Sequence, residues 1–214
     1  MGQKISPTSF RIAVNRPWAS RWFGGRKYTS FLRADVAVRK LLDERLRGMS
    51  VDQVVLERGD DALKVIIYTA RPGLIIGRGG SGIDELKKRI IAILKKKVNV
   101  QVEIQELKNP EASAAVVAES IAEQIEKRIP FRRIMKMTLA KIMASRDVKG
   151  AKIQIGGRLD GAEIARLEHL EAGSLPLQTL RADIDFARQT AYTTYGTVGI
   201  KIWIYKGQVF DTKQ

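Results

Sequence analysis

The amino-acid sequence predicts an α/β (α+β) protein of two domains preceded by a basic arm. A chain of 214 residues is long enough for two hydrophobic cores. Apolar residues repeat at helical spacing in some segments and alternate with polar residues in others, which indicates a mixture of helices and strands. The pair Asn109-Pro110 separates two such series. We therefore expect an arm over residues 1–28, a first domain over residues 29–107 and a second over residues 108–214.

The first domain is expected to combine strands and helices in the order helix, two strands, two helical segments and a final strand. Gly48 is a typical helix stop, and Arg58-Gly59-Asp60-Asp61 is typical of a turn between strands. The expected elements are a helix over residues 29–48, strands over 51–57 and 63–69, a short apolar turn over 74–76, a helix from residue 83 to the lysines at 95–97, and a strand over 98–105.

The second domain is expected to form a mixed sheet packed by helices. Pro130 should end a first helix, because proline cannot continue a helical hydrogen-bond ladder. Val198, Ile200 and Ile202 alternate with other residues, as in a strand with one buried face. The expected elements are helices over residues 114–129, 131–145 and 161–171, and strands over 151–155, 181–191 and 198–205.

The charge balance predicts a polyanionic partner. Lys and Arg number 38 against 23 Asp and Glu, for a net charge of +15 and a pI near 10.2. Residues 1–50 hold eleven of the basic and three of the acidic side chains. Aromatic residues interleave with these cations, and we expect Arg11 and Trp22 to contact RNA. The alternative is that the arm tucks its aromatic side chains into its own domain.

The composition argues against most enzyme classes. There is no cysteine, and His169 is the only histidine, so neither a thiolate nucleophile nor a paired-histidine metal site can be built. We expect no cofactor and no metal. No apolar run approaches the roughly 20 residues that span a bilayer, and there is no signal-peptide pattern, so we expect no membrane partner and a protein that stays where it is made.

A glycine-rich segment follows the second strand of the first domain, with the sequence Gly77-Arg78-Gly79-Gly80-Ser81-Gly82. It satisfies the dinucleotide-binding pattern G-x-G-x-x-G, but Pro72-Gly73 and a helical turn intervene after the strand, and the Gly-Lys-Ser/Thr of a P-loop is missing. The alternative is a GXXG clamp over residues 77–80 between two helical segments, as in KH domains of the prokaryotic type (type II). A purely architectural glycine turn is the remaining interpretation.

In a GXXG clamp, the absence of side chains lets backbone amides and a helix N-terminus approach an RNA phosphate. We expect Gly77, Arg78, Gly79 and Gly80 to form this clamp, with Arg78 supplying positive charge.

A second basic site is expected on the helix over residues 131–145. Arg132, Arg133 and Lys136 fall on one side of that helix, within about 100° of arc. Like charges at this spacing repel, so an external phosphate would neutralise them favourably. An ordinary solvated helix face is the alternative.

Over nearly its whole length the chain resembles the family of the third protein of the bacterial-type small ribosomal subunit. The N-terminal motifs that carry the resemblance are Met1-Gly2-Gln3-Lys4, Phe10-Arg11, and Ala70-Arg71-Pro72-Gly73 before the glycine loop. The C-terminal ones are Phe131-Arg132-Arg133 and the segments 157–166, 176–185 and 194–204.

The resemblance implies a structural protein of the small-subunit head, located on the cytoplasmic ribosome of a bacterium or on that of an organelle. It implies binding to small-subunit rRNA and a place lining the channel through which mRNA enters, beside ribosomal proteins ten and fourteen. In that family the positions of Arg132, Arg133 and Lys136 are associated with unwinding mRNA. Gly79 occupies a loop position that is commonly basic in relatives, so Lys87 and Lys88 are expected to add charge to the clamp.

Two other functions remain open from the sequence. One is a free KH-domain regulator that binds transcripts. The other is an enzyme, such as a nuclease that acts through Glu163 with Asp183 or Asp185, although these acids are equally typical of surface or capping positions.

Overall fold

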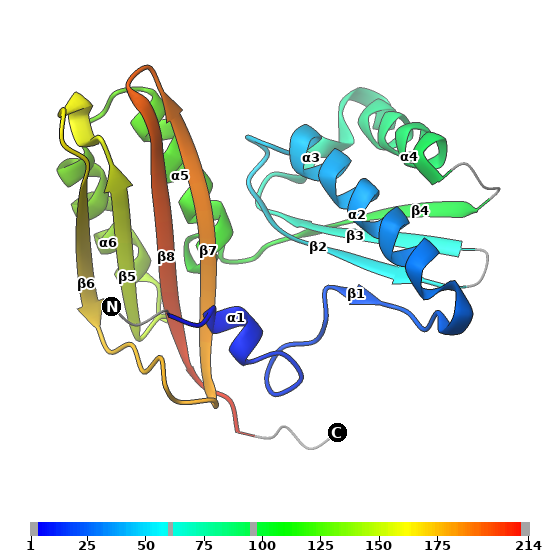
Figure 1. The fold of residues 1–214 in the computed structure, drawn as a ribbon, viewed down its shortest axis with the longest axis horizontal. Helices are drawn as coiled ribbons and strands as arrows, with labels where there is room; N and C mark the ends of the chain where they lie inside the picture. The colour runs from blue at the N-terminus through cyan, green and yellow to red at the C-terminus, as the bar shows by residue number, and fades with distance from the viewer. Residues whose placement is uncertain (1–3, 60–61, 95–97, 211–214) are drawn as a thin grey trace. The chain divides into compact units, whose positions relative to one another are not determined.

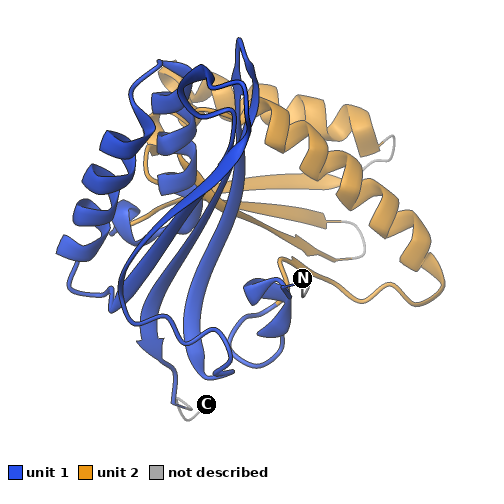
Figure 2. Ribbon diagram, turned by 60° about the vertical axis from the view of Figure 1, so that its left-hand side comes forward, with its two compact units in different colours: residues 1–17, 109–214 blue, residues 18–108 orange. Residues whose placement is uncertain are grey.

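The computed structural model describes residues 4–59, 62–94 and 98–210 and divides the chain into two compact units. The N-terminal unit comprises residues 18–108, and the C-terminal unit comprises residues 1–17 and 109–214 (Figure 2). The basic arm is therefore split between the units instead of forming a separate segment. Asp60 and Asp61 of the expected turn, and Lys95 to Lys97 at the expected helix end, lie outside the described residues.

The N-terminal unit is a mixed four-stranded sheet with helices on one face (Figure 1). Its strand order is β1-β2-β3-β4, with β1 parallel to β2, β2 antiparallel to β3, and β3 parallel to β4. The strands are β1 (Ser20–Arg21), β2 (Val51–Arg58), β3 (Ala62–Thr69) and β4 (Asn99–Glu106), and the α-helices are α2 (Tyr28–Arg45), α3 (Pro72–Ile76) and α4 (Ser81–Leu94).

Burial follows the expected periods in this unit. Val38 and Leu42 of α2, Ile67 of β3 and Ile90 of α4 are at most 1% exposed and belong to one core. Ile75 of α3 packs in the same core, so the core holds the helix after which the glycine loop begins.

The C-terminal unit is an antiparallel sheet with the order β6-β5-β8-β7, covered on one face by α5 and α6 (Figures 1 and 2). Helices α5 and α6 match those expected over residues 114–129 and 131–145, whereas the sheet is antiparallel throughout and not mixed. The elements are α1 (Pro7–Phe10), α5 (Ala114–Glu126), α6 (Phe131–Ala144), β5 (Gly150–Gly157), β6 (Arg166–Gly173), β7 (Ala182–Thr193) and β8 (Gly196–Gln208), with short 3₁₀ turns at Pro110–Ala112 and Leu159–Gly161.

The prediction of a helix over residues 161–171 is wrong, because Arg166–Gly173 forms β6. This segment pairs along its whole length with β5, from Gly157↔Arg166 to Gly150↔Gly173. Leu167 and Leu170 lie on opposite faces of this strand. Hairpin pairing overrides the helix propensity of the Leu, Glu and Ala residues in this segment.

Replacing Gly150 by Ala should destabilise this hairpin. An added Cβ would lie 2.0 Å from the backbone oxygen of Ser174, so the β5–β6 connection would have to shift. We expect the free energy of unfolding in urea to fall by about 1–3 kcal/mol. Gly199→Ala is the matched control, because its Cβ would meet no atom closer than 3.8 Å. Equal unfolding midpoints for the two variants would contradict this packing.

Candidate nucleic-acid interface

The glycine loop has a backbone that other residues adopt with difficulty. Gly77, Gly79 and Gly80 have φ values of +69°, +62° and +83°, in the left-handed region. The loop joins the end of α3 at Ile76 to the start of α4 at Ser81 and is largely exposed. The peptide groups of the predicted clamp are therefore accessible to a ligand.

The glycines of this segment have two different roles. A Cβ on Gly82 would lie 2.3 Å from the Ile75 oxygen and 3.0 Å from the Ile76 oxygen, so Gly82 lets α4 start against the end of α3. By contrast, a Cβ on Gly79 or Gly80 would meet nothing within 4 Å. The architectural interpretation therefore accounts for Gly82, while Gly79 and Gly80 border open space.

The cations beside the loop differ in their surroundings. Arg89 and Arg45 both contact Glu85 at 2.6 Å, so a carboxylate already neutralises part of their charge. Arg78 and Lys88 are exposed, and Lys87 is half-buried on α4. Arg78 and Lys88 are therefore exposed cations beside the loop for which no ion pair with a described carboxylate is found.

The cations of α6 project from a helix whose opposite side is buried. Arg132, Arg133 and Lys136 are exposed, while Ile134 and Met135 are at most 2% exposed in the core. The core therefore fixes the direction in which these cations point. Lys141, which the sequence analysis passed over, is also exposed nearer the end of this helix.

Arg166 is a further cation that the sequence analysis missed. Its guanidinium carbon lies 5.5 Å from the centroid of the Phe131 ring, and that of Arg132 lies 5.7 Å from the same centroid. Arg166 thus joins the α6 cluster from β6. The sequence around Arg166 does not indicate this contact with Phe131, because the contact depends on the pairing of β6 with β5.

A cavity of about 490 Å³ adjoins the start of α6, and several polar groups in its wall are engaged in the fold. Asp160 accepts a hydrogen bond from the Phe131 amide at 3.4 Å, and Glu126 accepts one from the Tyr192 amide at 2.9 Å. Arg158 donates to the Ala162 oxygen at 2.9 Å. The first of these contacts holds the start of α6, and the other two hold neighbouring segments of the C-terminal unit.

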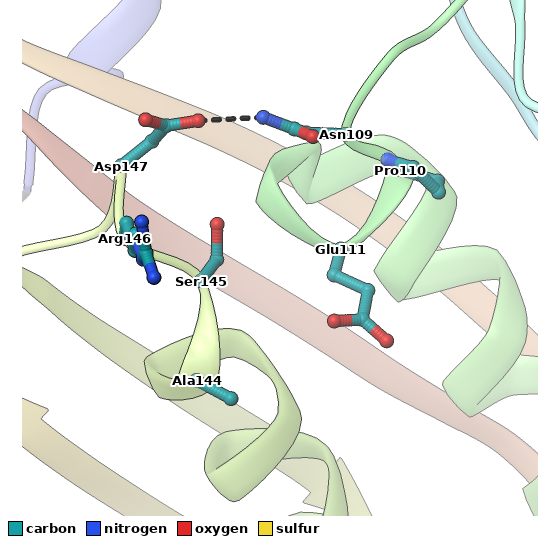
Figure 3. Close-up of a pocket in the computed structure, with 7 residues that line it drawn as sticks. All are labelled: Asn109, Pro110, Glu111, Ala144, Ser145, Arg146 and Asp147. Atoms are coloured by element: carbon teal, nitrogen blue, oxygen red, sulfur yellow. Dashed lines mark hydrogen bonds between the residues drawn. The ribbon is translucent and has the colours of Figure 1, made fainter.

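A second cavity of about 530 Å³ lies near the end of α6 (Figure 3). Asn109 donates to Asp147 at 2.6 Å across it, and Glu111 also lines it. Glu111 and Asp147 outnumber the one cation in its wall, Arg146, so the local charge disfavours a phosphate.

The structure does not support the expected contact of Arg11 with RNA, because this side chain is buried. The side chain is 0% exposed, and its guanidinium donates at 2.7–3.1 Å to four backbone oxygens, those of Pro7, Leu177, Thr179 and Ala182. Burial, followed by the charge of Arg16, lowers the pKa of Arg11 from its ordinary value, and Asp183 opposes this shift. Arg11 fastens the first segment to the C-terminal unit.

Trp22 is likewise held within its own unit. Its indole nitrogen donates to Asp35 at 2.7 Å, and Asp35 also pairs with Arg58 at 2.8 Å. The ring packs at 5.4 Å from Tyr28 and 5.6 Å from Phe31, measured between centroids. These contacts favour the alternative for Trp22, in which the arm packs its aromatic side chains into its own domain, over stacking on RNA bases. In contrast, Trp18 and Phe23 are 63% and 94% exposed.

Among the described residues, no group of three His, Cys, Asp or Glu side chains is placed to hold a metal ion. No helix in the described segments has the length and apolarity to cross a membrane.

Comparison with known proteins identifies relatives over the whole chain. Residues 37–112 match the family described as KH domain, and residues 121–204 match the one described as ribosomal protein S3, C-terminal domain. These matches confirm the predicted order of a KH domain followed by a second α/β domain.

Three bacterial relatives, each named small ribosomal subunit protein uS3, align with 100% of this chain. The protein of Exiguobacterium sibiricum is 45% identical and covered over 97% of its length. The proteins of Syntrophomonas wolfei and Desulfitobacterium hafniense are 47% and 46% identical and covered over 93% and 96%.

Arg11→Lys should destabilise the protein although it keeps the charge. An ammonium cannot reproduce a planar fork that donates to four separated oxygens, so buried carbonyl groups lose their partners. We expect the free energy of unfolding in urea to fall by about 2–4 kcal/mol. Arg26→Lys, at an exposed position, is the control and should change little. A stable Arg11→Lys variant would contradict the anchoring role.

Proposed function

Because this chain belongs to the family of small-subunit ribosomal protein S3, a family of structural, non-enzymatic proteins, we propose that it is a constituent of the small-subunit head on the cytoplasmic ribosome. There it binds small-subunit rRNA and lines the channel through which mRNA enters. The observation that carries the proposal is the exposed cluster of Arg132, Arg133 and Lys136 on a helix that is buried behind them.

The KH domain contributes the rRNA contact in this proposal. Left-handed glycines that border open space allow backbone amides to approach a phosphate closely. Arg78 and Lys88 add positive charge that attracts the RNA backbone. Affinity at this site should therefore fall as salt rises.

The α6 cluster contributes the mRNA contact. Phosphate contacts from Arg132, Arg133 and Lys136 would hold a strand after its duplex has opened, while movement of the ribosome supplies the work. Such a device needs no nucleotide site of its own. Arg166 lies where it can extend the same surface.

In the assembled subunit, the neighbours of the chain would be ribosomal proteins ten and fourteen. A free KH-domain regulator is the alternative, and sucrose-gradient fractionation separates the two functions. We expect the chain to sediment with small subunits. Recovery mainly in RNA-containing fractions that lack small subunits would favour the regulator.

The double replacement Arg78→Asp with Gly79→Asp should weaken RNA binding. The change removes one cation and adds two carboxylates beside the clamp, and Asp tolerates the left-handed backbone of Gly79 better than most residues. We expect affinity for small-subunit rRNA to fall about tenfold at low salt and less at high salt. Gly79→Asn, which has a similar shape without the charge, is the control. Unchanged binding by the double variant would leave the loop with an architectural role only.

Replacing Arg132, Arg133 and Lys136 together by Ala should slow translation of mRNA with stable hairpins, because the separated strand loses its phosphate contacts. These side chains are exposed, so folding and subunit assembly should be retained. The measurement is the rate of translation of a structured and an unstructured message, with Lys141→Ala as a control on the same helix. Equal slowing on both messages would exclude a role in opening mRNA structure.

A further inference from the structure

The C-terminal sheet has a second face, opposite α5 and α6, that carries a row of polar and basic side chains. The strand register places His169 of β6 beside Gln154 of β5, Gln154 beside Lys201 of β8, and Lys201 beside Arg188 of β7. We call His169, Gln154, Lys201 and Arg188 the basic row. It crosses all four strands, a span of about 14 Å at the usual strand spacing.

Burial confirms that this row points away from the helices. Ile200 and Ile202, on either side of Lys201 in β8, are at most 1% exposed and belong to the core under α5 and α6. Lys201, Arg188 and His169 are exposed. Since neighbouring residues of a strand face opposite ways, the basic row lies on the other surface of the sheet.

The pair Lys201 and Arg188 is unfavourable for the isolated fold. Like charges directly opposite each other on neighbouring strands destabilise a sheet. No carboxylate of the described residues forms an ion pair with either side chain. The neighbouring register row contains a carboxylate, that of Glu171, but it already pairs with Lys152 at 2.8 Å. This hydrogen bond lowers the pKa of Glu171.

Two glycines and an exposed leucine border the basic row on one side. The adjacent register positions on β5 and β8 are Gly156 and Gly199. A Cβ on Gly199 would meet no atom closer than 3.8 Å, whereas one on Gly156 would lie 2.8 Å from Cδ1 of Leu167, which is 63% exposed. On the other side, Trp203 packs against Phe186 at 5.2 Å and is only 7% exposed. The basic row therefore lies between one exposed leucine and a packed aromatic pair, and its two neighbouring cations supply the charge that a phosphodiester backbone requires.

We infer that the basic row binds the phosphodiester backbone of an RNA segment that runs across the four strands. The inference rests on the proposed function, because it adds a third RNA contact to a ribosomal protein. This contact differs from the α6 surface: Arg166, which joins that surface, precedes Leu167 in β6, and Leu167 lies on the same face as the basic row. The two surfaces would therefore hold different segments of RNA.

The test compares two variants of the full chain with a fluorescein-labelled single-stranded RNA of about twelve nucleotides. Lys201→Gln with Arg188→Gln removes the repelling pair, and Lys152→Gln removes a cation that is already neutralised on the same face. Each phosphate contact on a single strand contributes about 0.7 to the slope of log affinity against log salt concentration. The double variant loses two such contacts, so its slope should fall by about 1.4 and its affinity on the order of tenfold at 0.1 M salt. The Lys152→Gln variant should keep the slope of the unmodified chain.

His169 gives an independent readout, because it is the only histidine in the chain. Its imidazole signal in an NMR titration should move when the RNA is added, because a phosphate would then lie near the ring. An unmoved His169 signal together with an unchanged salt slope in the double variant would overturn the inference while leaving the loop and α6 contacts intact. Failure of the unmodified chain to bind any RNA would instead defeat the proposed function itself.

A polyglutamate peptide of about ten residues tests for an acidic protein partner. We expect the RNA to shift the His169 signal at lower concentration than the peptide does, because release of the counterions condensed on the RNA backbone adds to its affinity. The reverse order would overturn the inference and identify the row as a protein-binding surface.

Discussion

The protein holds more positive charge than its own carboxylates neutralise, and its candidate binding surfaces depend on how the fold keeps that charge in place. Some cations are consumed by the structure: Arg11 is surrounded by backbone oxygens, and Arg58 pairs with the buried Asp35. Others stand on elements whose opposite side is packed in a core, as Arg132 does on α6. Repulsion among cations of the second kind costs little per pair but persists until an external anion arrives.

The glycine loop shows how packing creates an accessible backbone. Gly82 permits the close meeting of α3 and α4, so the position of the loop is set by the core that holds Ile75 and Ile90. Gly79 and Gly80 then keep left-handed conformations with free space around them. One segment therefore combines a packed support with exposed glycine backbone, which suits the proposed clamp.

The antiparallel sheet of the C-terminal unit separates two kinds of cationic surface. On one face, α6 and the nearby Arg166 share the Phe131 ring. On the other, Lys201 and Arg188 are neighbours on adjacent strands. Because each strand alternates between these faces, a single sheet can stabilise one core and display charge on both of its sides.

The sequence by itself determined the periodic elements, the glycine loop and the exposed face of α6, because these depend on spacing within a short segment. It also carried enough motifs to identify the family. Only the tertiary structure decided that residues 166–173 form a strand, that Arg11 and Trp22 are anchored within the fold, and that Arg166 reaches Phe131. The physical reason is that these features depend on partners distant in the chain, such as Leu177 and Ala182 for Arg11, and local spacing carries no information about such partners.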